Sequence, residues 1–262
     1  MSKNTDRNSR RSQAEFTRNA ANYVTKRFNV SNPLERVLIL LVVAAVVGIG
    51  AGVLLPKISP EVGELTGEYV ASGDAADTLE TLRVDDNQSG EGYERDLFGF
   101  RETDDDGDGC DVREAVLARD MEDVTYTYPG GCKVKTGVLH DLYTGKTIHF
   151  VRGPQTSKAV QIEHVVALEN AWRSGARDWS TAERYEFGND MYNLLAADGA
   201  ANQDKGSASA AYWLPTNEDF RCEYVARQIG VKDKYDLSVT TKEKQAMLSV
   251  LRSCPGQEVP AE

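Results

Sequence analysis

The sequence has few cationic side chains, few histidines and few cysteines. Its 262 residues hold 30 Lys and Arg against 41 Asp and Glu, a formal net charge of −11. This balance argues against a nucleic-acid partner, because binding to phosphate backbones depends on cationic contacts. Three histidines leave few candidates for a mechanism that needs an imidazole. The four cysteines include no C-x-x-C pair, which disfavours a zinc site.

The charge is distributed unevenly along the chain. Residues 1–36 carry eight Lys and Arg against three Asp and Glu, a net charge of +5, so the remainder carries −16. Residues 37–55 (VLILLVVAAVVGIGAGVLL) follow without a single charged side chain. At about 1.5 Å rise per residue, this run spans the roughly 30 Å hydrocarbon core of a bilayer. The pattern predicts a transmembrane helix.

A cleaved signal peptide is the alternative interpretation of the apolar run. The preceding stretch of thirty-six residues is long for a signal peptide and no good A-x-A site follows, so an uncleaved signal anchor is favoured. The basic side of a span stays in the cytoplasm. We therefore expect residues 1–36 to be a disordered cytoplasmic tail and residues 56–262 to lie outside the membrane, or to be secreted if the anchor is cleaved.

The region beyond the apolar run predicts a stalk, one domain and a short tail. The stalk covers residues 56–74, the domain 75–254 and the tail 255–262. Short strand-like stretches alternate with short helical ones, which indicates an α+β fold. Outside the cytoplasm cysteines form disulfides, and proximity favours Cys110–Cys132 and Cys222–Cys254 among three possible pairings. Expected helices cover residues 112–119, 166–174, 181–187 and 241–252 and one beginning near 200, with strands at 124–128, 133–139, 147–151, 159–166 and 193–196.

Glu163 and His164 interrupt an otherwise apolar strand (AVQIEHVVALENAW). An apolar strand gains nothing from two adjacent polar residues unless they line a site. On these residues alone, however, a strand end at which both side chains reach solvent is the favoured interpretation. Downstream, Asn193 opens a second apolar strand, and Asn202 and Lys205 share one face of the helix that follows. The two expected strands and the helix that follows them would thereby carry a carboxylate, an imidazole, two amides and an ammonium.

This arrangement resembles the HNH, or ββα-metal, nuclease superfamily. The chain is most similar to the HNH-type domain at the C-terminus of modification-dependent restriction endonucleases, and to secreted bacterial HNH endonucleases. The likeness covers about residues 75–254 in six blocks: GYERDLFGF, DGDGCDVREAVLARD, GCKVKTGVLHDLYTG, QIEHVVALENAWRSGARDW, RYEFGNDMYNLLAADGAANQDKG and WLPTNEDFRCEYVARQIGVKDKYDL. Two residues depart from the usual pattern: Glu163 stands where Asp is commoner, and Gly188 where Ala is.

The resemblance implies a metal-dependent endonuclease. His164 is then the general base that takes a proton from the attacking water, as a neutral imidazole can. Glu163 and Asn202 would hold one divalent cation, Mg²⁺ or Mn²⁺. Asn193 would brace the loop that orients His164, and Lys205 would contact a phosphate. The products are 5′-phosphate and 3′-hydroxyl ends, and we expect a monomer acting on DNA rather than RNA.

An Asp-rich loop, TDDDGDGCD, supports a different function. Its aspartates and Gly109 match the start of an EF-hand calcium loop, but position twelve is Ala115 and Glu114 is one residue out of place. A structural Ca²⁺ site and a solvated acidic turn both remain open. In the alternative function the chain is a noncatalytic cell-surface calcium-binding or adhesion module. The candidate ligands are Asp104, Asp106 and Asp108.

Cationic residues near the catalytic pair answer the objection raised by the net charge. Residues 57–132 carry −15 and residues 133–262 only −1, and within the latter the stretch 133–162 carries +4. Five cations produce that excess, Lys133, Lys135, Lys146, Arg152 and Lys158. Arg173 and Arg184, close to the catalytic pair in sequence, are further candidates for phosphate contacts. The sequence therefore predicts cleavage that weakens as salt rises.

Overall fold

The first part of the chain is a single long apolar helix. The computed structural model describes residues 32–58, 62–63, 70–99, 104 and 109–261, and the chain divides into two compact units, Met1–Val70 and Ala71–Glu262. Helix α2 (Pro33–Ile58) contains the whole predicted run 37–55. The side chain of Asn32 accepts a hydrogen bond from the backbone N–H of Leu34 at 3.0 Å, as a helix N-cap does. The helix is long and apolar enough to cross a membrane, a test that a signal sequence also passes.

The second unit contains two separate antiparallel sheets. The larger has the order β1 (Met121–Tyr126), β2 (Val134–His140) and β3 (Thr147–Val151). The smaller pairs β4 (Val160–His164) with β5 (Leu194–Asp198). In that pair Glu163 lies opposite Leu195 and His164 opposite Leu194. Strand side chains alternate between faces, so the two neighbouring polar residues point to opposite sides of the hairpin.

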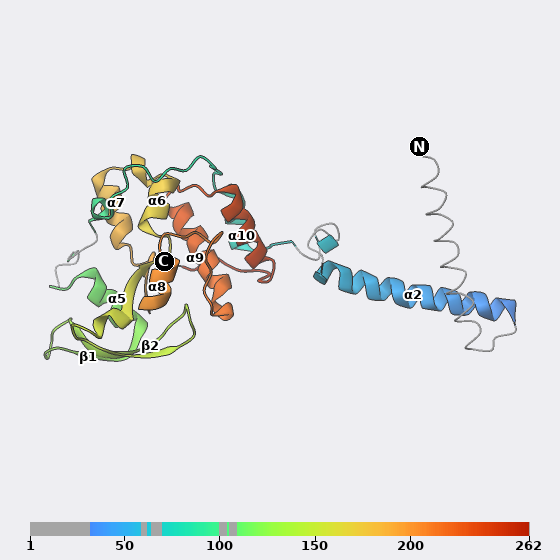
Figure 1. The fold of residues 1–262 in the computed structure, drawn as a ribbon, viewed down its shortest axis with the longest axis horizontal. Helices are drawn as coiled ribbons and strands as arrows, with labels where there is room; N and C mark the ends of the chain where they lie inside the picture. The colour runs from blue at the N-terminus through green and yellow to red at the C-terminus, as the bar shows by residue number, and fades with distance from the viewer. Residues whose placement is uncertain (1–31, 59–61, 64–69, 100–103, 105–108, 262) are drawn as a thin grey trace. The chain divides into compact units, whose positions relative to one another are not determined.

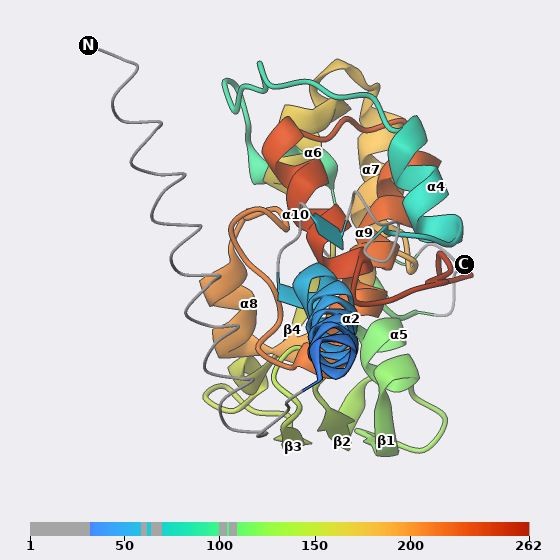
Figure 2. The same ribbon diagram turned by 90° about the vertical axis from the view of Figure 1, so that its right-hand side faces the viewer.

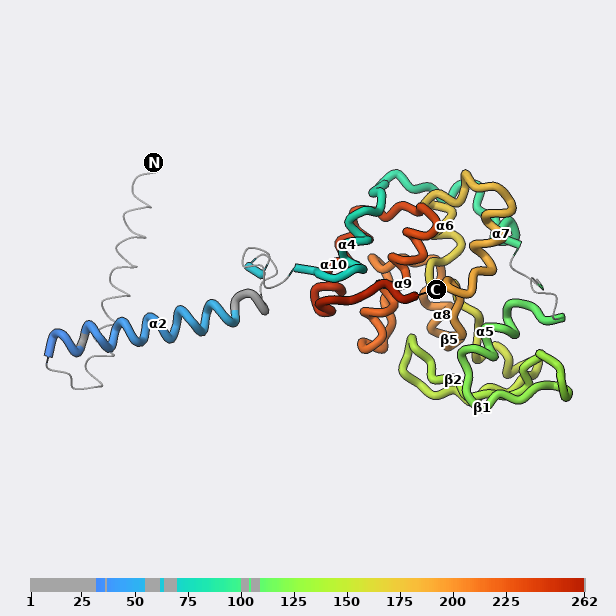
Figure 3. Tube along the Cα trace, turned by 180° about the vertical axis from the view of Figure 1, so that it is seen from behind, coloured from blue at the N-terminus to red at the C-terminus, as the bar shows by residue number. Residues whose placement is uncertain are grey.

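Helices surround the small hairpin and cover the end of the unit away from the large sheet (Figures 1 and 2). Helix α8 (Gly199–Lys205) follows β5 directly. The tube in Figure 3 shows α6 and α7 gathered with α4 and α10 at the end opposite β1 and β2. The remaining α-helices are α4 (Asp74–Thr81), α5 (Val112–Asp120), α6 (Leu168–Ser174), α7 (Thr181–Asn189), α9 (Arg221–Lys234) and α10 (Thr241–Leu251), and the 3-10 turns are η1 (Arg95–Phe98), η2 (Ser157–Ala159), η3 (Ala176–Asp178) and η4 (Glu218–Phe220).

The mixed α+β fold expected from the sequence is confirmed, with one correction next to Glu163 and His164. The predicted strand 159–166 ends at His164, and the predicted helix 166–174 begins only at Leu168. The intervening residues are held by Asn193. Its carbonyl accepts from the N–H of Val165 at 2.8 Å, and its side chain bonds both backbone groups of Val166. A chain fixed in this way continues neither the strand nor the helix.

Both disulfides expected from sequence proximity are present. Cys110–Cys132 and Cys222–Cys254 each join Cα atoms 6.0 Å apart, so the alternative zinc interpretation is wrong. Cys222–Cys254 links the start of α9 to the turn that follows α10. Beyond this turn, the N–H of Gly256 donates to Ser72 O, and that of Ala75 to Gln257 O, at 3.0 Å each. The segment after residue 254 is therefore hydrogen-bonded to the entry of the second unit.

Candidate active site

The hairpin and α8 bring three of the predicted site residues to one cleft. Glu163 and His164 from β4 and Asn202 from α8 all line a cleft with a volume of about 510 Å³. Glu163 is 4% exposed and His164 is 5% exposed. The interpretation of this pair as a strand end that reaches solvent is therefore wrong. The other polar residues that line the cleft are Tyr93, Arg95, Gln161, Glu169, Gln203 and Ser207.

His164 is held as a neutral imidazole. Its Nε2 lies 2.9 Å from the carbonyl oxygen of Gly188 in α7, a geometry in which Nε2–H donates. In the neutral ring that tautomer leaves the lone pair on Nδ1. Burial lowers the pKa of His164 from 6.5 to about 4, although the bond to Gly188 opposes the shift. The ring is therefore uncharged at neutral pH, the form that accepts a proton.

Lys205 contacts Glu163 and His164 from inside the protein. Its side chain is fully buried, and its Nζ forms an ion pair with Glu163 Oε1 and donates to the carbonyl oxygen of His164 at 3.0 Å. Burial raises the pKa of Glu163, and the ammonium of Lys205 opposes that rise. Lys205 thus contacts both members of the pair from inside the protein. Its predicted phosphate contact stays a prediction.

Asn193 and Asn202 occupy different positions relative to the cleft. Asn193 is completely buried, and its amide accepts from Val166 N at 2.8 Å and donates to Val166 O at 3.2 Å. It fixes the backbone just after His164. Asn202 lines the cleft and donates through Nδ2 to Gln161 Oε1 at 3.1 Å. This bond directs the Nδ2 side of the amide toward β4.

The turn between β5 and α8 sets the position of Asn202. Asp198 caps α8 by accepting from the N–H groups of Ala200 and Ala201 at 3.0 and 2.9 Å. At Gly199 a Cβ would lie 2.2 Å from the carbonyl oxygen of Lys158, so only glycine fits there. Asn202 and Lys205, three residues apart, then share a helix face toward β4.

The two arginines predicted to contact phosphate have protein partners in this conformation. Arg173 forms an ion pair with Glu169 one turn earlier in α6. Arg184 donates through Nη1 to the carbonyl of Trp179 at 2.5 Å, and its guanidinium lies 5.8 Å from the centre of the Trp172 ring. Their phosphate contacts stay predictions.

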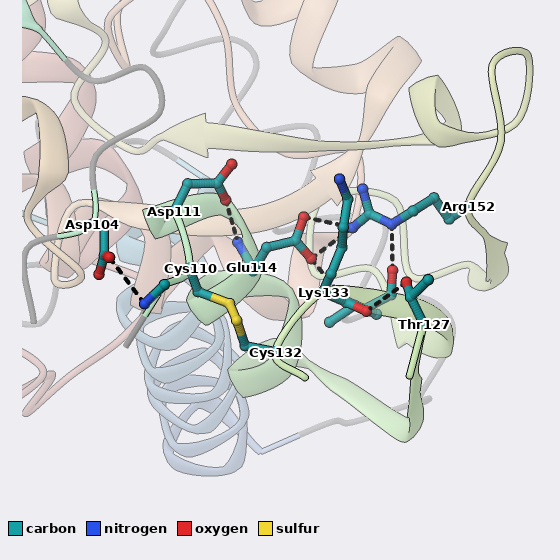
Figure 4. Close-up of a disulfide and its surroundings, with 10 residues drawn as sticks. Asp104, Cys110, Asp111, Glu114, Thr127, Cys132, Lys133 and Arg152 are labelled. Carbon is teal, nitrogen blue, oxygen red and sulfur yellow. Dashed lines mark hydrogen bonds and ion pairs between the residues drawn. A yellow bond between two sulfur atoms is a disulfide. The ribbon is translucent and has the colours of Figure 1, made fainter. Parts of the chain in front are cut away.

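The Asp-rich loop is described only at its ends. Asp104 accepts a hydrogen bond from the N–H of Gly109 at 2.9 Å, while Asp106 and Asp108 lie outside the described residues. Glu114, next to the last position of an EF-hand loop, is 5% exposed and forms an ion pair with Arg152 at 2.6 Å. It also accepts from the N–H of Val134 at 2.8 Å. Figure 4 shows these groups around the Cys110–Cys132 bridge. The one carboxylate close to the missing calcium ligand is therefore engaged elsewhere.

The oxygen donors of the cleft suit a hard cation with few protein ligands. Across the described ranges, no three His, Cys, Asp or Glu side chains cluster closely enough to hold a metal ion. Glu163 and Asn202 both line this cleft, and their side chains carry a carboxylate and an amide oxygen. Mg²⁺ is bound in this way, by one or two protein oxygens together with waters and substrate phosphate.

The strands β4 and β5 and helix α8 bring a glutamate, a histidine and an asparagine to the lining of one cleft, residue types that can hold a metal ion and accept a proton. The chain belongs to the family of the C-terminal domain of GmrSD restriction endonucleases, whose family model matches residues 111–250. It is also 37% identical over 182 residues to an "Uncharacterized secreted protein" of Arthroderma benhamiae (strain ATCC MYA-4681 / CBS 112371), covering 69% of this chain and 84% of that protein. No solved structure matches the chain. The predicted relation to restriction endonucleases is confirmed, and the family indicates a nuclease with a nucleic-acid substrate.

Proposed function

We propose that the chain is a metal-dependent HNH endonuclease that cuts DNA in preference to RNA. The proposed ββα-metal core consists of β4, β5 and α8. The observation that supports it most strongly is that Glu163, His164 and Asn202 line one cleft although they are up to 39 positions apart in the sequence. The description of the family as restriction endonucleases supports DNA as the substrate.

In the proposed mechanism, His164 accepts a proton from the attacking water through Nδ1. The water oxygen attacks the phosphorus and the bond to the 3′ oxygen breaks. The departing 3′ oxygen takes a proton from a solvent water, so a 5′-phosphate and a 3′-hydroxyl result. Asn193 and Gly188 keep the imidazole in place from the loop and from α7. Lys205 keeps the Glu163 carboxylate aligned. Glu163 and Asn202 would hold one Mg²⁺ or Mn²⁺, which stabilises negative charge on the phosphate and the departing oxygen.

Cleavage of nucleic acid by the full chain in detergent tests this proposal. Supercoiled plasmid DNA and a structured RNA are each incubated with Mg²⁺, Mn²⁺ or EDTA. We expect nicking and linearisation of DNA with either metal, slower cutting of RNA, and no cutting in EDTA. His164→Ala should lower the rate by about 10²–10⁴-fold, the usual contribution of a general base. His149→Ala, at an exposed histidine of β3, is the matched control and should cut at the wild-type rate.

Two outcomes would contradict the mechanism: cutting that persists in EDTA, or a wild-type rate in His164→Ala. Absence of cutting with either metal on both nucleic acids would favour the noncatalytic surface module instead. In that case a rise in melting temperature with Ca²⁺ would support the calcium-binding function, because a ligand that binds the folded state stabilises it.

We also propose that α2 anchors the chain in the cytoplasmic membrane and that the second unit acts outside it. The basic residues before α2, the two disulfides and the secreted relative all support this location. Secretion after cleavage of the anchor is the alternative. We expect the second unit to act as a monomer.

A further inference from the structure

The segment around η1 forms one wall of the cleft although it lies far upstream of β4. Phe98, at the end of η1, is completely buried and its ring centre lies 6.0 Å from that of Phe187 in α7. At the other side, the ring of Tyr93 meets that of Trp172 edge-on at 6.3 Å. Trp172 also donates from Nε1 to the carbonyl of Glu91 at 3.0 Å. The segment is therefore fixed to α6 and α7 on both sides of Arg95.

The backbone of η1 leaves little freedom at Arg95. The turn begins at Arg95, and the N–H of Leu97 donates to the carbonyl of Glu94 at 3.1 Å. Gly99 ends it at φ 57°, where a Cβ would lie 2.9 Å from the ring of Tyr185. Only a glycine accommodates both the left-handed conformation and the close ring. These contacts hold the Cα of Arg95 at the rim of the cleft.

Arg95 is the cationic residue among the described residues that line the cleft. The acidic lining residues are Glu163 and Glu169. A phosphodiester brings a further negative charge, and hydrolysis adds another in the transition state. Burial is the main cause of the shifted pKa values of Glu163 and His164, and the guanidinium of Arg95 lowers both. Arg95 lines the same cleft as Glu163 and His164.

The three cationic residues that the sequence predicts to contact phosphate occupy positions different from that of Arg95. Lys205 is bonded to Glu163 and His164 from inside the protein, and Arg173 to Glu169. Arg184 donates to backbone carbonyls of the α6–α7 connection. None of the three lines the cleft as Arg95 does. Among the described lining residues, Arg95 is therefore the cationic neighbour of a phosphate bound in this cleft.

We propose that Arg95 binds the scissile phosphate and stabilises its additional charge in the transition state. A guanidinium donates two parallel hydrogen bonds to the non-bridging oxygens of a phosphate, which an ammonium cannot do. This assignment rests on the proposed nuclease function and adds a catalytic residue from outside the hairpin and helix.

Steady-state cleavage of a duplex oligonucleotide by the full chain tests the assignment. Arg95→Ala should lower kcat by about 10²–10³-fold, as the loss of one donor to a developing negative charge does, with a small change in KM. Arg95→Lys should keep part of the rate, because it retains the charge and loses the fork. Arg83→Ala, at an exposed arginine that faces Asp85, is the matched control. Arg95→Ala should melt at the wild-type temperature, since the side chain is exposed.

A second substrate shows whether Arg95 acts on the phosphate itself. At the mapped cleavage position, one linkage is replaced by a neutral methylphosphonate. If Arg95 binds that phosphate, the ratio of wild-type to Arg95→Ala rates should shrink to less than about tenfold on this substrate, because interacting groups are not additive. An unchanged ratio, or Arg95→Ala cutting the ordinary duplex at the wild-type rate, would overturn the assignment while leaving the nuclease proposal intact. A wild-type chain that cuts nothing would instead overturn the nuclease proposal.

Discussion

At the scale of single residues, burial moves Glu163 and His164 toward their uncharged forms. It raises the pKa of the carboxyl and lowers the pKa of the imidazole to about 4. The carboxylate has a compensating partner in the ammonium of Lys205. The imidazole has the carbonyl of Gly188, which the neutral Nε2–H tautomer already satisfies. Because burial disfavours the charged imidazole of His164, pH affects the stability of the fold through this ring.

The stability of the metal-free protein should fall between pH 6.5 and pH 4.5. In this window the unfolded His164, with an ordinary pKa of 6.5, binds a proton that the folded ring, with a pKa of about 4, refuses. Each pH unit corresponds to about 1.4 kcal/mol, so the ring contributes up to about 3 kcal/mol. Glu163 acts in the opposite sense, because its raised pKa favours protonation in the folded state.

Urea unfolding at the two pH values separates these contributions. His164→Gln removes the imidazole, so its loss of stability from pH 6.5 to pH 4.5 should be smaller than that of the wild type by about 2–3 kcal/mol. The matched variant His149→Gln, at an exposed position of β3, should retain the wild-type loss. Equal losses in wild type and His164→Gln would show that the ring is not held neutral.

At the scale of helices and strands, the sequence predicts elements whose buried residues follow a simple period. Alternation places β3 at Thr147–Val151, as predicted, and α5 and α10 lie within one residue of their predicted ends. Helix α9 was not predicted. Its buried residues form a nearly continuous run from Tyr224 to Lys232 that includes Gln228 and Lys232. Such a helix has no clear polar face to mark its period. Its buried Gln228 and Lys232 contact residues distant in the sequence: Gln228 Nε2 donates to Val165 O, and Lys232 forms an ion pair with Glu243.

The site shows the same division between local and long-range information. The grouping of Glu163, His164 and Asn202 could be predicted because the sequence blocks that carry them resemble those of the family, although α6 and α7 separate β4 from β5. Arg95 could not, because its place in the cleft depends on Phe98 and Tyr93 packing against α6 and α7. The only available signal was that the block GYERDLFGF belongs to the stretches that resemble the family.

Helix α2 carries a prediction about membrane attachment. If it spans the bilayer, the chain should stay in the membrane pellet after alkaline carbonate extraction. Val43→Arg with Val46→Arg places two charges at the middle of the span, each costing about 3 kcal/mol, and should release the chain from the pellet. Val43→Leu with Val46→Leu is the matched control and should remain. A wild-type chain found in the medium without its first residues would show cleavage of the anchor instead.

At the scale of the whole molecule, the net charge of −11 conceals a cationic surface that the structure leaves exposed. In the stretch 133–162, which carries a net charge of +4, the four lysines are exposed, whereas Arg152 forms an ion pair with Glu114. These lysines lie just before β2, within β2, in the turn between β2 and β3, and in η2 just before β4, so they belong to the large sheet and to the start of the β4–β5 pair. In Figures 1 and 2 this sheet lies at the end of the second unit away from α10. The four are Lys133, Lys135, Lys146 and Lys158.

We therefore expect DNA cleavage to weaken as salt rises. If these lysines contact phosphates, kcat/KM should fall with salt, and replacing all four by Gln should reduce the slope of log(kcat/KM) against log[salt] by about 0.9 for each lysine in contact. Lys242→Gln with Lys244→Gln on α10 is the control for lost positive charge and should keep the wild-type slope. The same reduction in both variants would mean that overall charge sets the response, and an unchanged slope in the fourfold variant would place the DNA on another surface.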